Sequence, residues 1–132
     1  MQPGEQKQPF SLRKRIHHSN HALRGVGIFI KDTHAAWLHL FFALLAVYLG
    51  FLLRISNIEW IVILLTMSLI LAAEAVNTAI EIDVDLKSPE YNPKARDIKD
   101  IAAGAVLITV FLGGIIGMII FLPKVFALFY LK

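Results

Sequence analysis

Four polar residues directly behind an apolar run have the types and spacing of a reactive site. Glu74, Asn77, Glu81 and Asp85 follow the almost purely apolar stretch IEWIVILLTMSLILAA. If that stretch continues as a helix, a turn of about 100° per residue puts the four side chains in one stripe and Asp83 on the opposite side. Neighbouring carboxylates need a divalent cation, a basic partner or a raised pKa on one member. Oxygen-only ligands suit Mg²⁺.

The candidate partners of this stripe, Lys99 and Asp100, precede a third apolar run within KARDIKDIAAGAV. Small residues there, and in Gly113-x-x-x-Gly117 further on, let two helices approach closely. These parts suit phosphoryl transfer, because carboxylates hold Mg²⁺, a lysine neutralises phosphate oxygens and one carboxylate takes the acceptor's proton. The glycine-rich motifs G-x-x-x-x-G-K-[ST] and G-x-G-x-x-G are absent, so a nucleotide site must be built differently. The structural alternative is a set of salt bridges that fixes the topology.

The elements that carry these residues are predicted to be membrane helices. Hydrophobic residues make up 57% of the 132 positions, more than a soluble domain of this size can bury. Three apolar runs, at about 35–53, 58–76 and 102–121, are each long enough to cross about 30 Å of hydrocarbon. The predicted fold class is all-α, with residues 1–132 forming a single integral membrane domain.

The distribution of charge predicts the orientation of the chain. Residues 1–31 hold six Lys or Arg against one acid, and the loop between the second and third runs adds four more Lys or Arg, at positions 87, 94, 96 and 99. The positive-inside tendency places the N-terminus and this loop in the cytoplasm. Residues 10–31 mix basic and apolar positions, which predicts an amphipathic helix on the membrane surface. Residues 1–9 are expected to be a flexible tail.

The segment EAVNTAIEIDVD, followed by ARDIKDIAAGAVL, closely resembles the signature of the prokaryotic diacylglycerol kinase family. These are small three-span lipid kinases of the bacterial inner (plasma) membrane, and they include the undecaprenol kinases of Gram-positive bacteria. The resemblance covers about residues 10–122. It implies a homotrimer with active sites between protomers, which uses Mg²⁺ and ATP, acts on a membrane lipid and has no nucleic-acid partner.

The resemblance also implies roles for individual residues. Glu74 would be the general base toward the lipid hydroxyl, and Asn77 would orient the acceptor or the base. Glu81 would bind the metal that bridges the ATP phosphates, and Asp32 is expected as a second metal ligand. The other expected nucleotide-binding residues are Lys14, His21, Asp85, Glu90, Tyr91, Asn92, Lys99 and Asp100, with Lys99 on phosphate.

One departure from the family pattern concerns the first metal-binding position. Counted without gaps, the family's Glu falls on Thr33, and Asp32 can replace it only if the helix shifts register slightly. The Gram-positive pattern E-x-N-x-R-I-H reads here as THAAWLH. His39 is therefore retained, while the Glu, Asn and Arg are lost.

The sequence thus predicts ATP-dependent phosphorylation of a membrane lipid alcohol. The first interpretation is conversion of diacylglycerol to phosphatidic acid, and the alternative acceptor is undecaprenol. Both lipids present a primary hydroxyl at the interface, so the residues named above serve either. An alternative of another class is a non-catalytic membrane adaptor, whose basic helix binds anionic lipid and whose acids are salt-bridged. Thr33 keeps that alternative open.

Overall fold

The computed structural model describes the backbone of residues 12–130 and the side chains of residues 20–31 and 33–129. The tail predicted at residues 1–9 and the side chains of Lys14 and Asp32 lie outside the described residues. Four α-helices form the described part: α1 (Leu12–Asp32), α2 (His34–Leu52), α3 (Asn57–Lys87) and α4 (Pro93–Tyr130). α2, α3 and α4 are each long and apolar enough to cross a membrane. This confirms the prediction of an all-α protein with three spans.

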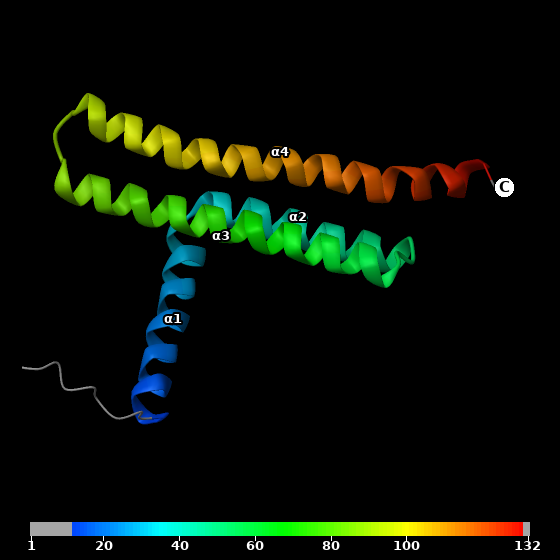
Figure 1. Cartoon of the computed structure of the whole chain (residues 1–132), viewed down its shortest axis with the longest axis horizontal. Helices are drawn as coiled ribbons and strands as arrows, with labels where there is room; N and C mark the ends of the chain where they lie inside the picture. Colours follow the sequence, from blue (N-terminus) through cyan, green and yellow to red (C-terminus); the bar gives the residue numbers. More distant parts are fainter. Residues whose placement is uncertain (1–11, 131–132) are drawn as a thin grey trace, which may run out of the picture.

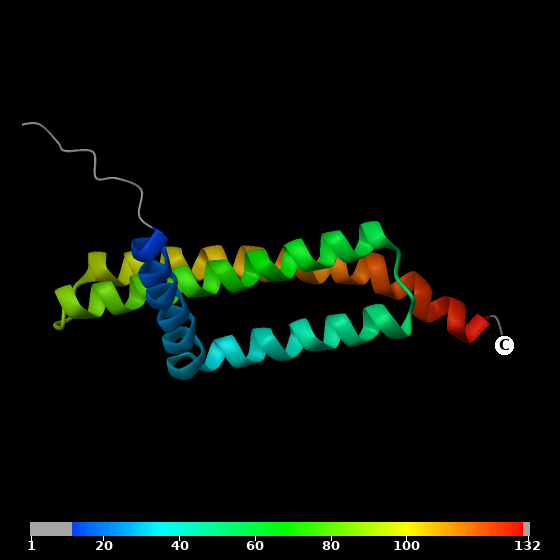
Figure 2. The same cartoon turned by 90° about the horizontal axis from the view of Figure 1, so that it is seen from below.

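The three spanning helices run side by side with alternating direction, and α1 lies crosswise to them (Figures 1 and 2). Thr33 separates α1 from α2 with an extended backbone, at φ −114° and ψ 110°. α1 ends at Asp32, one residue beyond the predicted segment. Its crosswise course fits a helix that lies along the membrane surface.

The tight turn between α2 and α3 has a local cause. Arg54 takes a left-handed conformation with φ 50°. Ser56 and Glu59 then form a capping box: Ser56 Oγ accepts from the backbone N–H of Glu59 at 3.3 Å, and Glu59 Oε2 accepts from the backbone N–H of Ser56 at 2.6 Å. This pair satisfies two of the donors that a helix start leaves open. Glu59 also pairs with Lys124 at 3.2 Å, which ties α3 to α4 at this end.

α3 continues well beyond the predicted second span. The apolar run was expected to end near residue 76, whereas the helix extends without a break to Lys87. At 1.5 Å per residue, α3 is roughly 46 Å long, against about 30 Å for the hydrocarbon core of a bilayer. The ends of α3 and α4 that meet at the connecting loop extend past the junction of α1 and α2 (Figure 1). α3 therefore carries its acids out of the apolar region.

α4 packs mainly against α3, and Gly113 accounts for their close approach. A Cβ at Gly113 would lie 2.7 Å from Ile70 Cδ1 and 3.1 Å from Thr66 Cγ2. At Gly117 an added Cβ would meet nothing within 4 Å. The predicted approach through small residues is thus confirmed at Gly113 and not at Gly117.

The outward faces of the spanning helices are apolar and exposed. Among the described residues, the buried hydrophobic side chains are Ala36, Ala43, Ile55, Ile63, Ala102, Val106 and Ile120. Large side chains such as Phe51, Leu107 and Phe111 are mostly exposed. A continuous surface of this kind is unfavourable in water and favourable in hydrocarbon. The chain is a membrane protein.

Candidate functional site

Glu74 is the one ionisable side chain that is buried within the described part of the chain, at 5% exposed. It lies on α3 where the apolar stretch ends, and it faces α2. There, Nε2 of His39 is 3.9 Å from Oε2 of Glu74. A carboxyl group buried at this depth is costly without a partner, so its position indicates a function.

One turn further along α3, Asn77 and Glu81 form a hydrogen-bonded pair. Nδ2 of Asn77 donates to Oε1 of Glu81 at 3.1 Å, and Asn77 is buried. The other amide atom, Oδ1, is also buried and accepts no hydrogen bond from any described residue. Leaving a buried acceptor unpaired costs about 1–3 kcal/mol. This oxygen is therefore open to a further hydrogen-bond donor.

The outer end of the stripe meets α4 at Lys99. Nζ of Lys99 donates to both carboxylate oxygens of Asp85, at 2.9 Å and 3.1 Å. This hydrogen bond raises the pKa of the Lys99 ammonium above its ordinary value, with further help from the charges of Asp85 and Glu81 and against the effect of partial desolvation. Asp100 does not join this pair, because it lies 3.5 Å from Nε of Arg96 on its own helix.

The other expected nucleotide-binding residues lie at the solvent side. Glu90 and Tyr91 are exposed in the loop between α3 and α4, Tyr91 at 81%. Oδ1 of Asn92 accepts the backbone N–H of Lys94 at 2.9 Å, so Asn92 caps the first turn of α4. His21 is exposed on α1. The structure thus leaves these side chains exposed, and their contact with a nucleotide stays a prediction.

The position of the missing acid, Thr33, lies against α3. Oγ1 of Thr33 is 3.4 Å from Oγ1 of Thr78, and Oγ1 of Thr78 donates to the backbone carbonyl of Glu74 at 3.0 Å. The family position is thus beside the stripe but carries a hydroxyl group instead of a carboxylate. The replacement by Asp32 stays a prediction.

The donor atoms on α3 suit Mg²⁺ in part. Glu81 offers carboxylate oxygens, and Asn77 holds one of them in place through its amide. Among the described side chains, no three Asp, Glu, His or Cys residues come together as a cation site. Mg²⁺ keeps several waters and binds through one or two carboxylates plus substrate phosphates. Glu81 is therefore compatible with a cation that arrives with a phosphate-bearing substrate.

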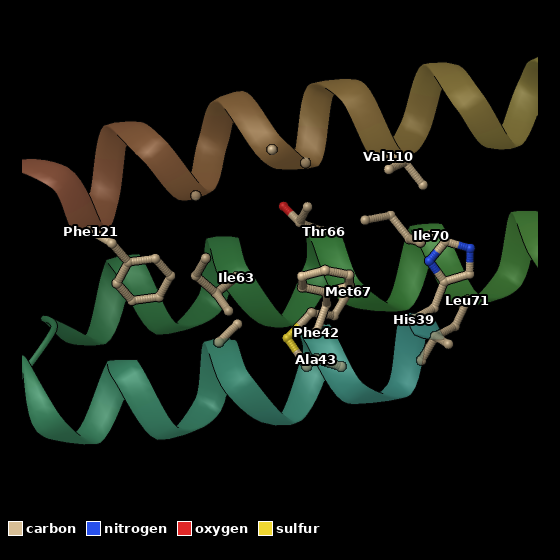
Figure 3. Close-up of a pocket in the computed structure, with 14 residues that line it drawn as sticks. His39, Phe42, Ala43, Ile63, Thr66, Met67, Ile70, Leu71, Val110 and Phe121 are labelled. Carbon is tan, nitrogen blue, oxygen red and sulfur yellow. The ribbon is translucent and has the colours of Figure 1, made fainter. Parts of the chain in front are cut away.

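An apolar cavity of about 320 Å³ lies within the bundle, between the three spanning helices. His39 lies at one end and Phe121 at the other (Figure 3). Gly113, Gly114 and Gly117 leave part of its wall without side chains. His39, the one ionisable residue in the lining, also faces Glu74. A lining of this kind suits the hydrocarbon part of a lipid.

The sequence alone indicates no role in the site for His39 or Thr78. A signal for His39 exists in retrospect, because it is an ionisable residue inside an otherwise uncharged span, and such residues are functional candidates. Its contact with Glu74 joins two different helices, and periodicity within one helix does not show which residues of two helices meet.

Comparisons with known proteins agree with this geometry. The family model described as prokaryotic diacylglycerol kinase matches residues 20–121. An undecaprenol kinase of Bacillus subtilis (strain 168) is 39% identical over 104 residues, covering 79% of this chain and 85% of that relative. A diacylglycerol kinase of Synechocystis sp. is 35% identical over 92 residues, covering 69% of this chain and 53% of that relative. The chain therefore belongs to the prokaryotic diacylglycerol kinase family and is a membrane lipid kinase.

Proposed function

We propose that this kinase transfers the γ-phosphoryl group of ATP to a lipid hydroxyl, with Glu74 as the general base. The observation that carries the proposal is the stripe on α3. It runs from buried Glu74, through the Asn77–Glu81 pair, to Asp85, which holds Lys99. α3 thus carries a buried carboxyl group at the end of its apolar part and, further along, the exposed Asp85 that holds the ammonium group of Lys99 from α4. The lipid hydroxyl and the ATP phosphates meet between these two groups.

In the proposed reaction, the lipid oxygen attacks the γ-phosphorus while Glu74 accepts the hydroxyl proton. A new P–O bond forms to the lipid, the bond from the γ-phosphorus to the bridging oxygen breaks, and ADP leaves. Asn77, whose Oδ1 is buried and open to a donor, is the residue proposed to orient the acceptor. Lys99 balances the charge of the phosphates, and Asp85 fixes the position of its ammonium group.

Glu81 is the proposed Mg²⁺ ligand on α3, and Asp32 is the proposed second carboxylate. Bound Mg²⁺ neutralises charge on the phosphate oxygens. Asp100, the loop residues Glu90, Tyr91 and Asn92, and the α1 residues Lys14 and His21 are the further proposed nucleotide contacts.

We also propose that the working unit is a homotrimer in the bacterial inner (plasma) membrane, with the N-terminus in the cytoplasm. The trimer is what the family resemblance implies, and the exposed apolar faces of the helices are surfaces on which protomers as well as lipid can pack. The mass of the protein in detergent micelles tests the assembly, and a monomer that is fully active would contradict it.

Two lipid alcohols are candidates for the acceptor. Diacylglycerol is the first, and its primary hydroxyl at the interface meets what the reacting groups on α3 require. Undecaprenol is the second, and the match to the B. subtilis undecaprenol kinase favours it, because identity and coverage are both higher than for the diacylglycerol kinase of Synechocystis. Reconstitution in lipid with labelled ATP, with each alcohol offered side by side, distinguishes them through the phosphorylated product.

The same reconstitution tests Glu74. Glu74→Gln should lower turnover at least about 100-fold, because general-base catalysis contributes about 10²–10⁴ in rate, while binding of an ATP analogue is retained. Asp83→Asn is the matched control, since Asp83 is an exposed carboxylate of the same helix that lies off the stripe and pairs with Lys87, and it should keep its turnover within about threefold. Near-normal turnover in Glu74→Gln would overturn the assignment of the base.

A further inference from the structure

We infer that His39 is a positioning residue of the phosphoryl-transfer site, which holds the Glu74 carboxylate in place for the lipid hydroxyl. The inference rests on the proposed function, because it assumes that Glu74 is the general base. It adds a residue of α2 to a site that is otherwise built on α3 and α4.

The geometry brings the two side chains together inside the bundle. His39 Nε2 lies 3.9 Å from Glu74 Oε2, and the side chains are 14% and 6% exposed. A carboxylate only accepts hydrogen bonds, so a favourable contact requires a hydrogen on Nε2. The distance is longer than a hydrogen bond, and contacts of catalytic groups often tighten only when substrate binds.

No other described side chain supports the Glu74 carboxylate. His39 is the one group within ion-pair distance of it, and the nearby hydroxyl of Thr78 bonds to the backbone carbonyl of Glu74 instead. A carboxyl group without a fixed partner is free to rotate away from its substrate, which makes catalysis less efficient. His39 also forms one end of the apolar cavity (Figure 3), so it lies between this cavity and the Glu74 carboxyl.

Two substitutions separate positioning from packing. His39→Phe keeps a ring of similar size and removes both nitrogens, whereas His39→Gln retains an N–H donor. Hydrogen bonds to a charged group are stronger than those between neutral groups. His39→Phe should therefore lower kcat about 10- to 100-fold and change the KM values for lipid and ATP less than about threefold. His39→Gln should recover most of that loss.

His34→Phe is the matched control, because His34 is an exposed histidine on the first turn of the same helix and should keep its wild-type kcat. Thermal melting and binding of an ATP analogue show whether each variant is folded. If His39→Phe does not fold, His39→Met takes its place, since Met is also apolar and adapts to irregular space.

Three results would overturn the inference: a normal kcat in His39→Phe, an equal loss in His39→Gln, or an effect confined to KM. Glu74→Gln, assayed in parallel, shows whether only the role of His39 is wrong or the proposed general base is wrong as well. If Glu74→Gln is inactive and His39→Phe is normal, only the role of His39 is wrong. If Glu74→Gln is active, the proposed base is wrong as well.

Discussion

The polar stripe on α3 combines side chains whose surroundings change sharply along one helix. Glu74 is 5% exposed, whereas the side chain of Asp85 is 65% exposed. A buried carboxyl can act as a proton acceptor away from bulk water, while an exposed one serves to place a counter-charge. The Asp85–Lys99 pair contributes about 0–1 kcal/mol to stability at such exposure. The pair therefore matters mainly because it fixes the position of the Lys99 ammonium group.

Lys99 should keep its charge over the whole working pH range. Asp85 raises its pKa above the ordinary value of 10.5, so the charged pair is fully present below that value and is lost only as the pH rises through the raised pKa. The pH dependence of binding of an Mg-ATP analogue between about pH 7 and 9.5 should then have the same shape for the wild type and for Lys99→Arg, since both residues are cationic there. A weakening at alkaline pH that arginine abolishes would contradict this.

At the scale of elements, α3 is one continuous helix that carries both the buried Glu74 and the exposed Asp85. The capping box at Ser56 begins it, and the helix has no break before its C-cap at Ser88. α4 begins separately, at Pro93, with Asn92 capping its first turn. The distance from Glu74 to Asp85 is thus fixed by helix geometry and not by a hinge.

The close approach of α3 and α4 predicts different effects for two glycines. Gly113→Val places its branched side chain against Ile70 and Thr66, and overpacking of this kind costs about 1–3 kcal/mol. Gly117→Val has the same change in helix propensity but open space around it. Thermal melting in detergent should show a lower Tm for Gly113→Val than for Gly117→Val. Equal melting temperatures would show that this contact does not hold the helices together.

Hydrophobic run length was sufficient to predict the three spans, and 3.6-residue periodicity was sufficient to predict the stripe. The roles of Glu74, Asn77 and Glu81 came from the family resemblance and not from their spacing. The contact of His39 with Glu74 and that of Thr33 with Thr78 were not predictable, because both depend on how separate helices pack. The pairing of Asp100 with Arg96 is different, because the two residues are four positions apart on one helix and such a pair follows from helix periodicity.

At the scale of the whole molecule, polar groups collect at the two ends of an apolar bundle. The α3–α4 loop and the Asp85–Lys99 pair lie at one end, and the α2–α3 turn lies at the other. α1, which follows the basic start of the sequence, lies toward the loop end of the bundle (Figure 1), and positive charge there favours the cytoplasm. Each end therefore has a defined side of the membrane in the proposed orientation.

Single cysteines test this orientation directly, because the chain has none of its own. Asn57→Cys marks the α2–α3 turn and Lys94→Cys marks the loop end of α4; both positions are exposed. A membrane-impermeant maleimide added to intact cells should label Asn57→Cys, and it should reach Lys94→Cys only after the cells are opened. The reverse pattern would contradict a cytoplasmic N-terminus.

Charged groups mark both ends of the apolar part of α3, with the Glu59–Lys124 pair at one end and Glu74 at the other. Fifteen residues of α3 separate Glu59 from Glu74, which is about 22 Å and less than the roughly 30 Å of an average hydrocarbon core. A thicker bilayer must compress locally or draw the Glu74 carboxyl into hydrocarbon, at a cost of fractions of a kcal/mol per Å. Turnover should therefore fall as phosphatidylcholine chains lengthen, and a flat profile would contradict this. The thickness of the membrane would thus adjust the rate without any contact by an effector.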